Sequence, residues 1–319
     1  MGYLIGTSSF RHVCIQGTIS VFFFGDRHNF RMKKNSDPRH GFPFFIQKYL
    51  NMYKDLPVDI FTEYEYITRT HPTRLRINEI PRGTVQNTDP IMQQFYSYFR
   101  EYLKIDKHPV DEHHFHYCDM RSRSLGPIVF GVEYIHILLE LSHRYHSPVR
   151  CDRETSELLI HCLLSFQKDP EYILFQSKII KQVTKWADQK ERHIFLRWFL
   201  SAFQDHLLTQ NEISLLENIL NDQLTVQGDG LNILSKIRRL TNLLVDAYTI
   251  GRLFNPSLKS TTRIVYMGED HIDEIVRIMT TLGLGGARCL FEERDTSYNC
   301  TLHTGHELLF MSQRPIQTG

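Results

Sequence analysis

Two four-residue segments far apart in the chain share a glycine, an acidic residue and a histidine at the same spacing. GDRH at 25–28 follows the apolar run 21–24, and GEDH at 268–271 follows the run 263–267. Because the chain holds 17 glycines and 17 histidines, one Gly-x-x-His is expected about once by chance. An apolar strand before the glycine and an acid after it make a repeated match far rarer. The pattern therefore indicates a shared function for both segments.

These residue types suit hydrolytic chemistry at the edge of a sheet. A glycine permits a sharp exit from the carboxyl end of a strand, the place where ligands bind in open α/β sheets. Two imidazoles beside carboxylates could hold a Zn, Mn or Fe ion with an open coordination position, where bound water becomes a nucleophile. We interpret His28 and His271 as metal ligands or acid–base groups, supported by Asp26 and Glu269. The competing interpretation is two ordinary turns.

Other polar residues stand at the ends of two further expected strands. Glu63 and Glu65 follow one strand, and Asp119 and Arg121 end another. Two carboxylates can divide into general acid and general base when their pKa values separate, and a guanidinium can stabilise an oxyanion. Glu63, Asp119 and Arg121 therefore join the candidate catalytic set. The alternative is a surface ion pair between Asp119 and Arg121 and solvent-exposed glutamates.

In its paired Gly-x-x-His segments the chain resembles the TraB/Tiki superfamily, which includes erythromycin esterases and ChaN-type haem-binding proteins. The match covers GDRH at 25–28 and GEDH at 268–271, with Glu63 or Glu65 in the place of the family's inter-motif glutamate and Arg121 in that of its arginine. The resemblance implies one site built from both segments. It also implies either a divalent-metal-dependent peptidase, as in Tiki proteins, or a metal-free esterase.

The chain departs from the superfamily pattern at one position and has a second resemblance elsewhere. Arg27 stands where many superfamily members have alanine or glutamate. The stretch DAYTIGRLF at 246–254 resembles uncharacterised proteins of large DNA viruses. That second resemblance implies a viral protein of the host cytoplasm or the virion.

A second histidine cluster competes for the role of metal site. His113, His114 and His116 include a His-x-His pattern like that of metal sites in barrel hydrolases. We expect these histidines ahead of a strand rather than at its carboxyl end, which favours a structural role. Cys118 could be a nucleophile, but a cysteine within a strand is usually a small core residue.

Strands and helices alternate at both ends of the chain and would position these residues. Short apolar runs predict strands at 20–24, 58–63, 114–121, 263–267 and 287–291, and helical spacing predicts helices at 45–53, 90–103 and 272–282. Residues 127–255 show helical periodicity almost throughout. We predict an α/β fold whose parallel-sheet core consists of residues 1–126 and 256–319, interrupted by an all-helical insertion at 127–255.

Composition excludes several classes of protein. Apolar residues make up 41% and charged residues 23% of the 319 residues, which is typical of a globular protein. The formal net charge of +1 argues against a general nucleic-acid coat, which needs excess Lys and Arg. No apolar stretch is long enough for a membrane span, and the first residues lack the pattern of a signal peptide. We expect a cytoplasmic protein.

The leading functional hypothesis is hydrolysis of an amide or ester bond in a peptide or small-molecule substrate, with or without a divalent metal. One alternative is binding of haem or another ligand in the same cleft without turnover. A second alternative is a host-interaction protein in which the helical insertion binds the partner and the cleft is a relic.

Overall fold

The computed structural model describes residues 3–5, 7–26, 46, 49, 57–63, 113–118, 127–168, 178–294 and 301–303. The chain divides into two compact units. One comprises Met1–Cys118 with Leu258–Gly319, and the other comprises Asp119–Ser257. Among the described helices, none combines the length and apolarity needed to cross a membrane.

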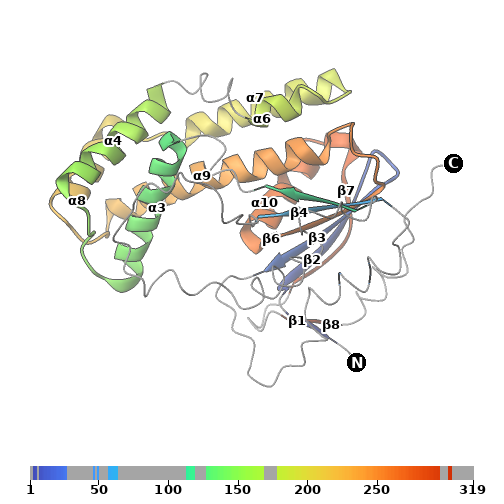
Figure 1. Ribbon diagram of the computed structural model, residues 1–319, viewed down its shortest axis with the longest axis horizontal. Helices are drawn as coiled ribbons and strands as arrows, with labels where there is room; N and C mark the ends of the chain where they lie inside the picture. The colour runs from blue at the N-terminus through green and yellow to red at the C-terminus, as the bar shows by residue number, and fades with distance from the viewer. Residues whose placement is uncertain are drawn as a thin grey trace, which may run out of the picture. The chain divides into compact units, whose positions relative to one another are not determined.

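A six-stranded sheet forms the centre of the first unit (Figure 1), in the order β5-β4-β6-β3-β2-β7. Its strands are β2 (Ser9–Ile15), β3 (Ile19–Asp26), β4 (Val58–Thr62), β5 (His113–Tyr117), β6 (Thr262–Gly268) and β7 (Arg288–Arg294). Strands β5, β4, β6 and β3 run parallel, whereas β2 is antiparallel to both β3 and β7. Two short strands, β1 (Tyr3–Ile5) and β8 (Thr301–His303), form a separate antiparallel pair.

The predicted α/β class is confirmed, but the sheet is mixed rather than parallel. Ile15 pairs with Ile19 across a tight turn, in which Gln16 and Gly17 have φ values of 53° and 71°. Glycine adopts this left-handed conformation without steric penalty, so the chain reverses and β2 and β3 form a hairpin. Strand β7 then pairs with the outer edge of β2, again antiparallel. The Gln-Gly turn is the sequence signal for this correction.

Apolar side chains fill the central strands of this sheet on both faces. Phe22, Phe23 and Phe24 are almost fully buried, which explains why the sequence of β3 is an uninterrupted apolar run rather than an alternating one. Helix α10 (Glu269–Thr281) follows β6 directly and packs against β3 and β6. Because α10 begins where β6 ends, its first turn lies at the carboxyl edge of the parallel strands.

The described residues of the second unit form helices and the turns that connect them, with no strand among them. Its helices are α3 (Pro127–Tyr145), α4 (Arg153–Lys168), α6 (Lys178–Val183), α7 (Gln189–Asp205), α8 (Gln210–Asn221) and α9 (Asp229–Leu253). Thr209 begins α8 with a capping box, in which its side chain and that of Glu212 each accept a backbone N–H of the other residue. Helix α7 buries Phe195, Phe199 and Phe203 at four-residue spacing, which gives this unit its own apolar core.

Of two helices predicted in the first unit, one is described in part and the other is not described. Within the predicted helix 45–53, Ile46 and Tyr49 are helical and fully buried. The predicted helix 90–103 lies outside the described residues.

Candidate functional site

Three parallel strands bring polar residues to one edge of the sheet. In the register of the sheet, Asp26 of β3 lies opposite Gly268 of β6, and Thr62 of β4 lies opposite Tyr266 of β6. Glu63, which follows Thr62, therefore reaches the same edge as Asp26 and the start of α10. The end of β6 meets two segments that are more than 200 residues earlier in the chain.

Glu63 contacts both the end of β6 and the histidine of the second motif. Its Oε2 accepts a hydrogen bond from the backbone N–H of Gly268 at 2.8 Å, and its Oε1 lies 3.5 Å from Nε2 of His271. Both side chains are buried, with 7% and 6% of their surface exposed. A carboxylate that faces one ring nitrogen favours the proton on that nitrogen and the lone pair on the other, Nδ1.

The other two carboxylates at this edge also accept hydrogen bonds from the protein. Asp26 Oδ2 accepts a hydrogen bond from the Tyr266 hydroxyl at 2.8 Å. Glu269 Oε2 accepts one from the Ser8 hydroxyl at 2.9 Å, and its Oε1 lies 3.2 Å from Nε of Arg294. His271 thus contacts a residue that follows β4, on one side of β6 in the strand order. Glu269 contacts residues from β7 and the start of β2, on the other side.

The glycines of the two motifs do not serve as sharp strand exits, which corrects the sequence interpretation. Gly25 lies inside β3, and Gly268 ends β6 with φ −56° and ψ 143°, a conformation open to any residue. Gly25 is required by close approach instead. A Cβ at this position would lie 2.3 Å from Ser9 Oγ and 3.1 Å from the Glu269 Cα.

The second motif forms the first turn of a helix rather than a loop before one. The sequence predicts a helix from Ile272, whereas α10 begins at Glu269. Its N-terminal N–H groups attract negative charge, and the Glu63 carboxylate binds the N–H of Gly268 just ahead of this turn. The acids at this edge therefore also stabilise the start of α10.

The described part of the candidate catalytic set consists of Asp26, Glu63, Glu269 and His271. All four are buried and lie at the carboxyl edge of the parallel strands. The remaining candidates, His28, Glu65, Asp119 and Arg121, lie outside the described residues. Three residues that contact these carboxylates are absent from the predicted set: Ser8 and Arg294 beside Glu269, and Tyr266 beside Asp26. Because Ser8 and Arg294 come from the antiparallel strands β2 and β7 or their flanks, only the antiparallel pairing, which the sequence analysis does not predict, could have pointed to them.

The predicted metal site stays a prediction, because His28, one of its two expected ligands, lies outside the described residues. No group of three His, Cys, Asp or Glu side chains among them is placed to hold an ion. The carboxylate oxygens of Glu63 and Glu269 accept hydrogen bonds from Gly268 and Ser8 instead. We therefore derive no catalytic step through a metal.

The competing histidine cluster belongs to a second buried polar network, centred on Asp59 near the amino end of strand β4. His116 lies within β5 rather than ahead of it, and its Nε2 is 2.5 Å from Asp59 Oδ1. The Ser260 hydroxyl donates to the other oxygen of Asp59, and Arg263 lies opposite Asp59 in the sheet register. Cys118 is a buried core residue, as expected.

In this second network, burial and the neighbouring charged and polar groups shift the pKa values of Asp59 and Arg263 in opposite directions. Burial alone would raise the pKa of Asp59, but the hydrogen bonds with His116 and Ser260 outweigh it and lower that pKa. Burial lowers the pKa of Arg263 to about 10, and the carboxylate of Asp59 opposes that shift. Arg263 therefore remains charged at neutral pH, and Asp59 is its counter-ion. The network joins β4, β5 and the start of β6, which favours a structural role.

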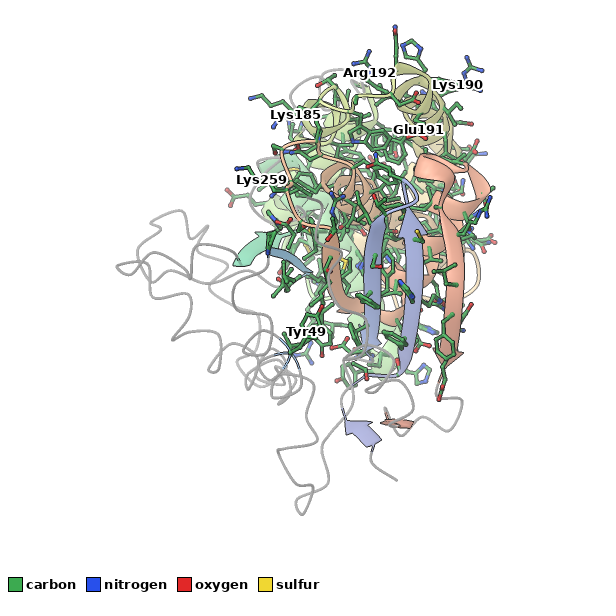
Figure 2. All side chains as sticks on the ribbon, turned by 90° about the vertical axis from the view of Figure 1, so that its right-hand side faces the viewer. Tyr49, Lys185, Lys190, Glu191, Arg192 and Lys259 are labelled. Carbon is green, nitrogen blue, oxygen red and sulfur yellow. The ribbon has the colours of Figure 1, made fainter. Side chains whose placement is uncertain are left out.

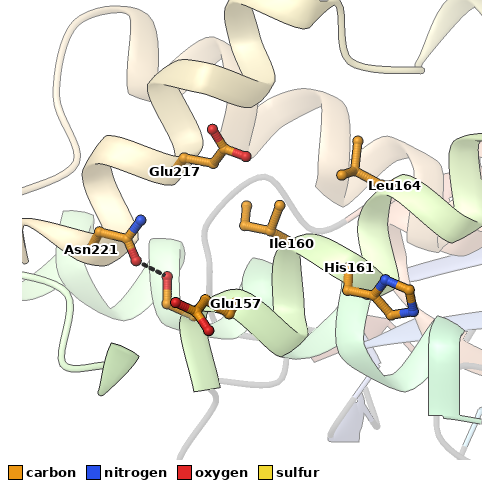
Figure 3. Close-up of a pocket in the computed structure, with 7 residues that line it drawn as sticks. Glu157, Ile160, His161, Leu164, Glu217 and Asn221 are labelled. Atoms are coloured by element: carbon orange, nitrogen blue, oxygen red, sulfur yellow. Dashed lines mark hydrogen bonds between the residues drawn. The ribbon is translucent and has the colours of Figure 1, made fainter. Parts of the chain in front are cut away.

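The second unit has a shallow depression of about 230 Å³ between α4 and α8 (Figure 3). Residues Ser156, Glu157, Ile160, His161, Leu164, Glu217 and Asn221 line it. Ser156 donates a hydrogen bond to Asn221 at 2.6 Å, and Glu157 pairs with Arg153 at 2.9 Å. Because Ser156, Asn221 and Glu157 are occupied by these contacts, we assign the depression no function.

Comparison with protein-family models, curated proteins and solved structures found no match to the chain.

Proposed function

We propose that the carboxyl edge of β3, β4 and β6 hydrolyses an amide or ester bond by general acid–base catalysis. The observation that supports this proposal is the His271–Glu63 pair, with 3.5 Å between Nε2 and Oε1. An imidazole oriented by a carboxylate is the usual means by which proteins remove a proton from water or a hydroxyl.

In the proposed reaction, Glu63 holds the proton on Nε2, so that Nδ1 of His271 accepts a proton from the attacking water. The hydroxide adds to the carbonyl carbon, and the protonated imidazole then donates that proton to the leaving oxygen or nitrogen as the bond breaks. Asp26 and Glu269 maintain the negative potential that stabilises the imidazolium. His28, which follows Asp26 by two residues in the chain, is the proposed second acid–base group.

Substitution of His271 tests the proposal directly. With p-nitrophenyl acetate and a fluorogenic casein as probes, His271→Gln should lower kcat/KM by roughly 100-fold, because general-base catalysis contributes about that factor or more. Glu63→Gln keeps the shape of the side chain and should lower kcat/KM roughly tenfold, since the neutral amide orients the ring but does not stabilise its charge. Initial rates across the pH range would measure both effects.

His193→Gln is the matched control, because His193 is an exposed histidine of α7 in the other unit. It should leave activity and melting temperature unchanged. Wild-type turnover by His271→Gln would contradict the proposal, as would an inactive wild-type protein. Metal content and the Soret absorbance of the purified chain distinguish the rival hypotheses, since stoichiometric metal favours a metallohydrolase and a Soret band favours haem binding.

A further inference from the structure

Basic residues concentrate on one helical hairpin of the second unit, formed by α6, α7 and the turn between them. Residues 178–197 contain six Lys or Arg against two Asp or Glu, a net charge of +4, although the whole chain carries only +1. This segment is therefore strongly cationic, although the chain as a whole is almost neutral. We call Lys181, Lys185, Lys190, Arg192 and Arg197 the cationic hairpin.

Most of these cations are available to a partner. Lys181, Lys185, Lys190 and Arg197 are exposed, and none forms an ion pair with another residue of the described ranges. Three exposed arginines elsewhere have carboxylate partners: Arg144 pairs with Glu140, Arg153 with Glu157 and Arg277 with Glu274. Like charges that are close together and unpaired repel one another, and a polyanion would relieve that repulsion.

Hydrogen bonds fix the geometry of the turn that carries the cations. Arg192 Nη1 donates to the Thr184 carbonyl at 3.2 Å, which joins the first turn of α7 to the end of α6. Asp188 caps α7 by accepting the N–H of Glu191 at 2.9 Å. Figure 2 shows Lys185, Lys190 and Arg192 together at the top of its view. The positive charges are therefore presented by an ordered turn and not by a flexible tail.

The packing of the aromatic residues in the hairpin argues against single-stranded nucleic acid and against a protein as the partner. Trp186 is buried and donates its ring N–H to the Gly251 carbonyl at 2.9 Å. Trp198 packs against Phe195, with 5.5 Å between ring centroids, and Phe199 is fully buried. The hairpin thus offers no exposed aromatic platform, whereas unstacked bases and protein partners are commonly recognised by aromatic side chains. Regularly spaced phosphates need only cations.

We propose that the cationic hairpin binds the phosphate backbone of a nucleic-acid duplex without reading its sequence. Lys190 and Arg197 are two helical turns apart on α7, about 10 Å along its axis, so they can meet different phosphates of one strand. Lys185 in the turn and Lys181 on α6 extend the contact beyond α7. This binding is independent of the hydrolytic site proposed above, which lies in the other unit.

Fluorescence anisotropy with a labelled mixed-sequence DNA duplex of about 20 base pairs tests the proposal on the full chain. Four phosphate contacts predict a slope of about −3.6 for log K against log salt, or roughly 100-fold weaker binding when salt rises from about 50 to 200 mM. The quadruple variant Lys181→Gln, Lys185→Gln, Lys190→Gln and Arg197→Gln should bind at least about tenfold more weakly at the lower salt, with a slope near zero.

The matched control is the double variant Arg144→Gln and Arg153→Gln, which removes two exposed but ion-paired cations of the same unit. It should bind the duplex like the wild type. Circular dichroism would establish that both variants remain folded, as expected for exposed side chains. A wild-type chain that does not bind, a quadruple variant that binds normally, or tighter binding to poly-glutamate than to the duplex would each overturn the proposal, the last result indicating an acidic protein partner.

Discussion

At the scale of single residues, Gly25 determines how closely β3 can approach the first turn of α10. A Cβ at Gly25 would overlap with Ser9 Oγ at 2.3 Å and press on the Glu269 Cα at 3.1 Å. Gly25→Ala should therefore lower the free energy of unfolding by about 1–3 kcal/mol, the usual effect of overpacking. Urea titration followed by circular dichroism would measure it.

The second substitution Ser9→Ala provides the control for that prediction. Removing the Ser9 hydroxyl eliminates the shorter of the two overlaps, so the double variant should recover part of the lost stability. Equal stability of Gly25→Ala and the wild type would show that β3 and α10 are not in this close contact. A double variant no more stable than Gly25→Ala would place the strain at Glu269 alone.

The sequence predicts those residues of the candidate site that directly follow an apolar run. Asp26, Glu63 and Glu269 each follow a recognisable strand, and parallel strands end at a common edge. Their partners could not be predicted, because Ser8 and Arg294 reach the edge from antiparallel strands whose pairing depends on tertiary contacts. The role of Gly25 was also hidden, since a close approach leaves no local pattern.

At the scale of elements, one face of α3 holds a histidine between two glutamates. His136 lies 3.7 Å from Glu133 and 3.3 Å from Glu140, measured from Nδ1 and Nε2 to the nearest carboxylate oxygens. Burial alone would lower the pKa of His136, but these two carboxylates outweigh it and raise that pKa. The close contact with His136 lowers the pKa of Glu140 to about 2, aided by Arg144 and Arg238, so Glu140 is ionised at neutral pH.

This arrangement predicts that alkaline pH destabilises the helical unit. Because the pKa of His136 in the folded state lies above its ordinary value of 6.5, the stabilisation is fully present below that value and is lost as the pH rises through the raised pKa. The free energy of unfolding should fall over this range, and His136→Gln should reduce the fall. Urea titrations at several pH values would measure the difference.

His161 provides the control for the histidine prediction, since it is an exposed histidine of α4. His161→Gln should keep the pH dependence of the wild type. If His136→Gln keeps it too, the carboxylates of α3 do not hold a charged imidazole.

The sequence predicts the helices more completely than it predicts the arrangement of the strands. Helical periodicity and caps such as Thr209 and Asp188 act locally, so the helices of the second unit can be recognised along the chain. Apolar runs identify buried strands, but a run does not show the direction of its strand. The turn at Gln16 and Gly17 indicates the antiparallel pairing of β2 with β3, whereas the pairing of β7 with β2 depends on tertiary contacts.

At the scale of the whole molecule, the helical unit Asp119–Ser257 interrupts a sheet whose strands come from both flanks. Both flanks are attached to the same strand, β4. The Cys118 N–H donates to the Thr62 carbonyl at 2.8 Å, and the Ser260 hydroxyl donates to Asp59. Asp59 and Thr62 are three residues apart, about 10 Å along a strand, so the two points where the chain leaves and re-enters the sheet unit are close together.

This proximity predicts that each unit can be produced without the other. A flexible linker of about eight residues can reach about 25 Å, so replacing Asp119–Ser257 by such a linker should leave the sheet unit folded. Residues 119–257 alone should show a helical circular dichroism spectrum and one cooperative thermal transition, because α7 and α9 bury their own apolar core of Phe195, Phe199 and Ile237. Calorimetry of the full chain and both fragments would test this. Aggregated or molten fragments would show that the units share one core, and the helical region would then be an integral part of the fold instead of an insertion.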